Sequence, residues 1–95
     1  MLFIIRAEDK PGALARRMEV RPTHLAYLQS RMEVIKVAGA TLDEKGDPMG
    51  SVLIVDVADK AEAEAFAKAD PFSVEGVFAS FTVTPYRAAL GAWMA

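Results

Sequence analysis

The sequence contains no cysteine and only one histidine, and these two scarcities narrow the chemistry open to the chain. Without cysteine, disulfide bonds, thiolate nucleophiles and thiolate metal sites are excluded. A single histidine leaves any metal ion to carboxylate ligands, and no metal-ligand spacing is present. The glycine-rich motifs that bind nucleotide phosphates are missing as well. The sequence therefore implies neither a metal nor a cofactor.

Positively and negatively charged side chains are nearly equal in number. The chain has 11 Lys and Arg against 13 Asp and Glu, for a net charge of −2. Nucleic-acid-binding domains usually show a basic excess or stripe, so we expect no nucleic-acid partner. The apolar start at residues 1–5 is followed at once by Arg6 and is too short for a signal peptide or a membrane span. We expect no membrane partner and a cytoplasmic location.

The length and composition are those of one small globular domain. The sequence is 53% hydrophobic and 25% charged, which is typical of a folded chain. Its 95 residues make a single domain over residues 1–95. A chain of this size buries roughly 60–70% of the surface that it exposes when unfolded. It can fold alone, but association with another subunit would help it.

Hydrophobic periodicity predicts alternating strands and helices. We predict strands over residues 2–7, 35–42, 51–57 and 77–84, and main helices over residues 22–33 and 60–68. The order β-α-β-β-α-β is that of the ferredoxin-like fold, an α+β class with a four-stranded antiparallel sheet and two helices on one face.

The ends of the two helices follow from proline and aspartate. Leu14 and Met18 are at helical spacing, so we expect a helical turn or two over residues 12–20. Proline breaks a helix interior but suits a first turn, so we expect a break near Arg21 and a new helix beginning at Pro22. Asp59 is expected to cap the second helix, and Asp70 before Pro71 to end it. The first helix should face the core with one apolar stripe: Leu25, Leu28, Met32 and Ile35.

The strands predict a homodimer. Residues 2–5 and 52–55 are continuous apolar runs rather than alternating ones, so both faces of the sheet carry apolar side chains. Two helices cover only one face of the sheet, so the other face would be a large exposed apolar patch. Burial against a second copy of the chain is the usual solution.

The single histidine, His24, is the strongest candidate for chemistry. Histidine normally titrates near neutral pH, and a carboxylate can hold its second ring nitrogen. Asp70 would supply that carboxylate if the fold brings the two together, and the pair would suffice for acid/base chemistry. Two ordinary alternatives remain open. His24 could be a partly buried histidine bonded to a backbone carbonyl, and Asp70 could simply terminate a helix.

Three further residues are candidates for contact with a substrate. Arg31 lies almost in line with His24 along the helix and could clamp an anion. Arg21 could anchor a carboxylate or phosphate, and Tyr27 could turn its hydroxyl into a pocket. The alternatives are a solvated helix-start residue for Arg21, a surface ion pair for Arg31 and simple packing for Tyr27.

Several blocks of the sequence resemble the YCII-related family. They are Met1–Ile5, Val20–Leu28 with its Arg-Pro-x-His-Leu pattern, Ala69–Phe72 with Ala-Asp-Pro-Phe, and Val83–Tyr86. The resemblance implies a ferredoxin-like, dimeric α+β fold similar to muconolactone isomerase. It also implies an enzyme with a histidine–aspartate pair at the active site, and these roles fall on His24 and Asp70. A related member acts as a chloromuconolactone dehalogenase.

Residues and resemblance together predict a small-molecule enzyme. His24 would move a proton during isomerisation, or during an elimination such as dehalogenation, of a small organic acid or lactone. Asp70 would orient the ring and favour its protonated form. Arg21, Tyr27 and Arg31 would contact the substrate. The sequence leaves open an alternative, a non-catalytic dimer that binds a small ligand or serves an accessory role in the same pocket.

Overall fold

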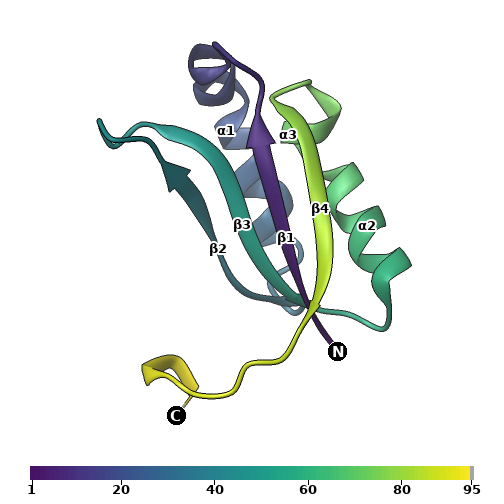
Figure 1. The fold of residues 1–95 in the computed structure, drawn as a ribbon. Helices are drawn as coiled ribbons and strands as arrows, with labels where there is room; N and C mark the ends of the chain where they lie inside the picture. The colour runs from purple at the N-terminus through teal and green to yellow at the C-terminus, as the bar shows by residue number, and fades with distance from the viewer. Residues whose placement is uncertain (95) are drawn as a thin grey trace.

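The computed structural model describes residues 1–94 and confirms the predicted α+β, ferredoxin-like order (Figure 1). The strands are β1 (Leu2–Asp9), β2 (Ile35–Leu42), β3 (Pro48–Asp56) and β4 (Phe78–Tyr86). The helices are α1 (Leu14–Gln29), α2 (Lys60–Ala69), the short α3 (Pro71–Val74) and a 3-10 turn, η1 (Ala92–Met94). The strand boundaries differ from the predicted ones by a few residues at β1, β3 and β4.

The sheet is antiparallel with strand order β2-β3-β1-β4. Helices α1 and α2 lie behind it on one face, α1 behind β2 and β3 and α2 behind β4 (Figure 1). Side chains alternate along β1, so Phe3 and Ile5 point to the helices and are almost fully buried. They join Val55 of β3 and Phe66 of α2 in the main core.

Helix α1 runs without interruption through Pro22, so the predicted break near Arg21 is wrong. Proline lacks the N–H that would bond the carbonyl of Met18, one turn earlier. Met18 is 53% exposed, so water can reach this part of the helix and replace the missing bond. The helix also ends at Gln29 rather than at residue 33.

The early end of α1 changes which residues face the core. Leu28 is buried and Leu25 half-buried, but Met32 is 61% exposed and Ile35 already belongs to β2. The predicted stripe is therefore wrong beyond Leu28. The buried positions are spaced three or four residues apart, as one helix face requires: Arg17, Val20, His24 and Leu28.

The corner after α2 places an aspartate between two helices. Asp59 caps α2 as predicted, accepting the backbone N–H of Glu62 at 2.8 Å. Helix α2 ends at Ala69, and Asp70 then caps α3, with Pro71 in its first turn. Pro71 suits that position because the N–H it lacks has no partner in a first turn. The result is a sharp corner that carries Asp70 into the interior.

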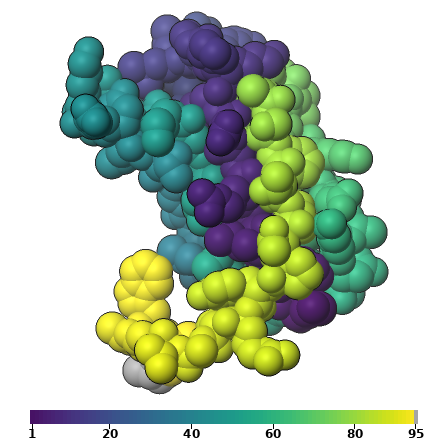
Figure 2. All heavy atoms as spheres, viewed as in Figure 1, coloured from purple at the N-terminus to yellow at the C-terminus, as the bar shows by residue number. Residues whose placement is uncertain are grey.

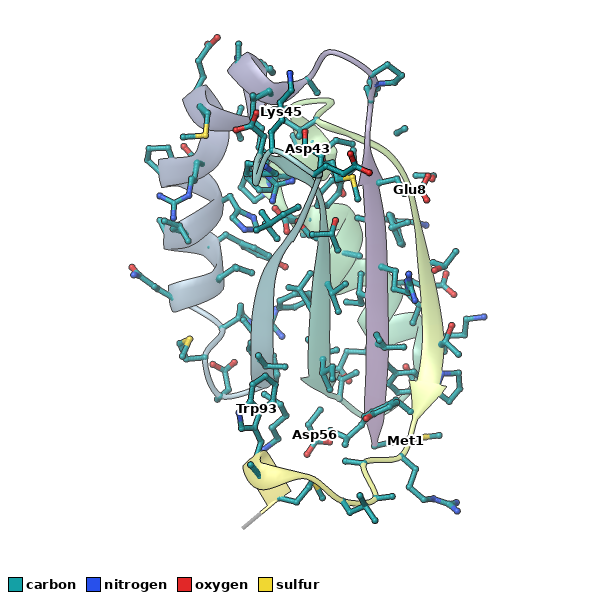
Figure 3. All side chains as sticks on the ribbon, turned by 60° about the vertical axis from the view of Figure 1, so that its left-hand side comes forward. Met1, Glu8, Asp43, Lys45, Asp56 and Trp93 are labelled. Atoms are coloured by element: carbon teal, nitrogen blue, oxygen red, sulfur yellow. The ribbon has the colours of Figure 1, made fainter. Side chains whose placement is uncertain are left out.

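The helix-free face of the sheet is apolar over one half and is met there by the tail. Leu2 and Ile54 are half-buried on it. The segment after β4 leaves the sheet and projects beside this face, with Leu90 and Trp93 almost nine-tenths exposed (Figures 1 and 2). Figure 3 places Trp93 at the end of the sheet that also holds Met1. The tail and the face enclose a hollow of about 700 Å³.

We predict that this face forms a homodimer interface. Sedimentation of the purified protein at micromolar concentration should give a dimer. Replacing Ile54 by lysine should shift it towards monomer, because Ile54 lies opposite Ile4 in the middle of the face. Lys68→Glu on α2, at an exposed position, is the control and should leave the dimer intact. A monomeric wild-type protein would contradict the prediction.

Candidate acid/base site

His24 and Asp70 meet inside the protein. The Nδ1 atom of His24 lies 2.8 Å from Oδ1 of Asp70, and the two residues are only 8% and 2% exposed. The predicted closeness of the two side chains is confirmed. The alternative of a histidine bonded to a backbone carbonyl through this nitrogen is not what the structure shows.

The surroundings of Asp70 define which ring nitrogen of His24 carries the proton. Oδ1 of Asp70 also accepts the backbone N–H of Phe72 at 2.9 Å. A carboxylate oxygen can accept both bonds, so His24 donates its Nδ1–H to it. In the neutral ring, the lone pair then belongs to Nε2, which is the nitrogen available to a ligand.

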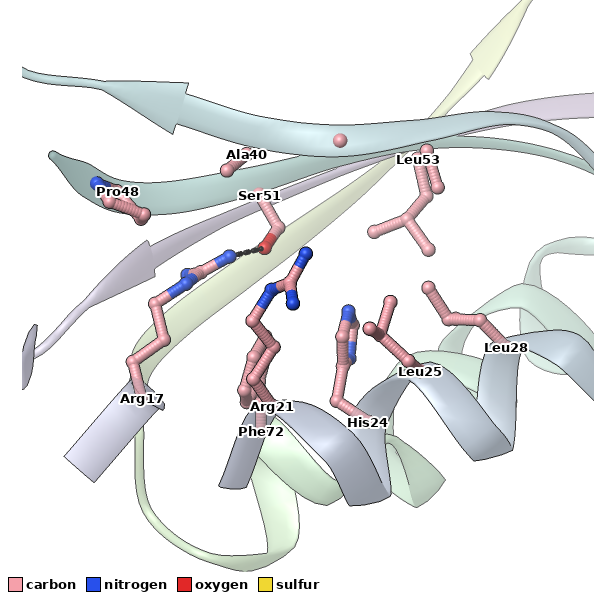
Figure 4. Close-up of a pocket in the computed structure, with 12 residues that line it drawn as sticks. Arg17, Arg21, His24, Leu25, Leu28, Ala40, Pro48, Ser51, Leu53 and Phe72 are labelled. Carbon is pink, nitrogen blue, oxygen red and sulfur yellow. Dashed lines mark hydrogen bonds between the residues drawn. The ribbon is translucent and has the colours of Figure 1, made fainter. Parts of the chain in front are cut away.

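The plane of the His24 ring is also held by stacking. The phenyl ring of Phe72 lies 3.8 Å from it, centroid to centroid, at an interplanar angle of 13°. The guanidinium of Arg17 lies over Phe72 as well, with Cζ 4.5 Å from the ring centroid. The bond to Asp70 and the stack on Phe72 together leave the imidazole little freedom to turn (Figure 4).

Arg17 is a member of the site that sequence reasoning missed. Its guanidinium donates to both carboxylate oxygens of Asp9 at 2.9 Å and to Oγ of Ser51 at 2.9 Å. Both ends of the Arg17–Asp9 pair are buried, with side chains 5% and 6% exposed. Helical spacing could have identified Arg17, because an unbroken α1 places it two turns before His24 on the same face of the helix.

A cavity of about 200 Å³ lies between α1 and strands β2 and β3. Its wall includes three charged or titratable side chains of α1, Arg17, Arg21 and His24. The rest is largely apolar or small: Leu25, Leu28, Ala38, Gly39, Ala40, Pro48, Ser51, Leu53 and Phe72. Figure 4 shows the edge of the His24 ring and the guanidinium of Arg21 reaching into this space towards β3.

Tyr27 and Arg31 make contacts within the fold instead. The hydroxyl of Tyr27 donates to the carbonyl oxygen of Phe66 at 2.9 Å, and burial raises the pKa of Tyr27 above its ordinary value. Arg31 lies over the Phe66 ring, with Cζ 5.2 Å from its centroid, and pairs with Glu33 at 3.3 Å. Neither side chain lines the cavity. Their contact with a substrate stays a prediction.

No group of three or more histidine, aspartate or glutamate side chains within residues 1–94 is arranged to hold a metal ion. Across the same residues, no helix is both long and apolar enough to cross a membrane.

Comparison with known proteins decides the family. Residues 1–87 match the YCII-related domain. The chain belongs to the YCII-related family. A protein named YciI from Escherichia coli O6:H1 is 33% identical over 95 residues, covering 92% of this chain and 97% of that protein. An uncharacterized protein from Haemophilus influenzae is 28% identical over the same shares of the two chains.

Solved structures confirm the fold and supply a relative with a ligand. The 5-chloro-2-hydroxyhydroquinone dehydrochlorinase TftG from Burkholderia phenoliruptrix, solved with 2,5-dihydroxybenzoquinone, is 35% identical with a TM-score of 0.86. The match covers 94% of this chain and 96% of TftG. An antibiotic biosynthesis monooxygenase, 20% identical with a TM-score of 0.54, shares the fold alone. The YCII-related chain thus has the ferredoxin-like fold of the dimeric α+β barrel proteins.

We predict that Asp70 stabilises the fold as well as the ring. Asp70→Ala should lower the free energy of unfolding by about 1–3 kcal/mol for each buried N–H left without an acceptor. Asp70→Asn keeps an oxygen and should cost less. Asp59→Ala, which removes an exposed helix cap, should cost about 1 kcal/mol and is the matched control. Urea unfolding of the variants gives the comparison, and equal losses for both alanine variants would contradict the prediction.

Proposed function

We propose that this YCII-related protein is a small-molecule enzyme in which His24 acts as the general acid/base. The observation that carries the proposal is the buried bond between His24 and Asp70 at the wall of a cavity. The bond leaves Nε2 as the basic nitrogen and fixes the direction of its lone pair. A base positioned in this way contributes about 10²–10⁴-fold to proton transfer.

The proposed reaction class is isomerisation or elimination of a small organic acid or lactone. Nε2 of His24 takes a proton from the substrate, and the electron pair of the broken bond forms a new double bond. In an elimination, a halide or other leaving group departs with the electron pair of its bond to carbon, and the imidazolium then releases its proton to solvent water. In an isomerisation, the imidazolium returns the proton to a different substrate atom. Neither route needs a further reactant.

Asp70 has two roles in this scheme. It holds the ring through Nδ1–H, and its negative charge stabilises the imidazolium that forms when Nε2 takes a proton. Water screens the attraction between this charge and the imidazolium only weakly, because Asp70 is 2% exposed. An amide at this position could still hold the ring but could not stabilise its positive charge.

The similarity to TftG supports elimination within this class. That protein is a dehydrochlorinase whose structure holds a small six-membered quinone. The cavity beside His24, about 200 Å³, has room for one substituted ring, since an engineered cavity of about 150 Å³ binds benzene. We propose Arg21, which reaches into the cavity, as a residue that contacts the substrate, and a homodimer as the working form.

The proposal is tested by chloride release from 5-chloro-2-hydroxyhydroquinone, followed by a panel of small lactones and organic acids. His24→Gln should lower kcat by about 10²–10⁴-fold on any compound that the wild type turns over. Asp70→Asn should lower kcat less. Thr23→Ala changes an exposed neighbour on α1 and should keep the wild-type rate. Circular dichroism checks that each variant is folded.

Two outcomes would contradict the proposal. A folded His24→Gln variant with the wild-type rate would show that His24 is not the acid/base. Binding of the panel compounds without turnover by the wild type would favour the alternative, a non-catalytic dimer that uses the same cavity for a small ligand.

A further inference from the structure

We propose that the cavity selects a planar monoanion, whose acidic oxygen binds Arg21 and whose flat ring lies between α1 and β2. The inference rests on the proposed function in that it assigns a ligand class to the same cavity.

The charges exposed in the cavity are positive. Arg17 and Arg21 line it, whereas Asp9 and Asp70 do not. Arg17 is already neutralised by its two bonds to Asp9. Arg21 forms no ion pair with any side chain of residues 1–94. One arginine is therefore left to pair with a ligand, which favours one negative charge on it.

Arg21 is accessible to a ligand. It is exposed and lines the cavity, and Figure 4 shows its guanidinium reaching towards Ser51 of β3, beside His24. Leucine side chains from α1 and β3 make up much of the remaining wall. Arg21 is exposed, so water screens part of its attraction for an anion, but a charged hydrogen bond is still stronger than a neutral one. A planar guanidinium also suits the two oxygens of a carboxylate or the delocalised oxygens of an acidic enol.

The opposite wall is flat because its side chains are small. Ala38 and Ala40 of β2 pair in register with Leu53 and Ser51 of β3, and all four line the cavity. We infer that the short side chains on β2 leave a slot-like space between this strand and α1. A flat ring fits such a slot better than a puckered one.

The spacing of Arg21 and His24 limits where the ligand reacts. They are three residues apart on α1, so their side chains begin about 5–6 Å apart on one face. An oxygen held by Arg21 therefore brings atoms of the same ring, or of a group attached to it, to Nε2 of His24. We infer that the proton moved by His24 lies within a ring's width of the anionic oxygen.

The test uses three probes of similar size and the single histidine as the reporter. Benzoate is planar and anionic, benzamide is planar and neutral, and cyclohexanecarboxylate is anionic but puckered. Each is titrated into the protein while the NMR signals of the His24 ring are followed, which gives a dissociation constant. Benzoate should bind about tenfold to a hundredfold more tightly than benzamide, and more tightly than cyclohexanecarboxylate.

Three variants test whether the preference belongs to the cavity. Arg21→Gln should remove the advantage of benzoate over benzamide, whereas Arg87→Gln, which removes the same charge from the exposed segment after β4, should keep it. Ala40→Leu should weaken all three probes by filling the slot. The inference is overturned if benzoate does not bind, if benzamide or cyclohexanecarboxylate binds equally well, or if Arg21→Gln keeps the preference for benzoate.

The result is separable from the proposed function. Loss of turnover in His24→Gln with no charge preference would leave the proposed enzyme intact and overturn only the ligand class. A charge preference that depends on Arg21, in a protein that turns over no compound, would support the ligand class and contradict the enzyme.

Discussion

The site depends on one carboxylate oxygen that accepts two hydrogen bonds. Oδ1 of Asp70 accepts the N–H of Phe72, the second residue of α3, and the Nδ1–H of His24 on α1. The same oxygen therefore joins α1 to α3 and sets the tautomer of the only histidine. Phe72 is fixed by the corner and stacks on the ring that Asp70 holds. The packing of the helices and the proposed proton transfer share one buried contact.

The sequence predicted much of the fold and the centre of the site. Strand runs, the Asp59 cap and the Asp70–Pro71 stop are local signals, and all three hold in the structure. The pairing of His24 with Asp70 spans 46 positions, and the residues could only suggest it; the family resemblance supplied the reason to expect it. Neither periodicity nor capping specifies which distant side chains meet.

The wrong helix break and the missed Arg17 have one physical cause. Proline usually breaks a helix interior, but Pro22 is exposed, and a helix whose proline faces water tolerates one lost bond. Breaking α1 at that point separated Arg17 from His24 and hid their common face. The continuous helix instead aligns Arg17, Arg21 and His24 along the cavity. Asp9 neutralises Arg17, Asp70 orients His24, and neither carboxylate lines the cavity. The unbroken α1 therefore places two arginines, Arg17 and Arg21, in the wall of the cavity, while the carboxylates of Asp9 and Asp70 lie outside it.

The central claim is that Asp70 makes Nε2 of His24 the free base. Long-range ¹H–¹⁵N correlation NMR of the single histidine tests it directly, because each ring nitrogen reports whether it carries a proton. In the neutral form, the account predicts a proton on Nδ1 in the wild type. It predicts a shift towards a proton on Nε2, the form that free imidazole side chains prefer, in Asp70→Ala. A neutral wild-type ring protonated on Nε2 would contradict the account.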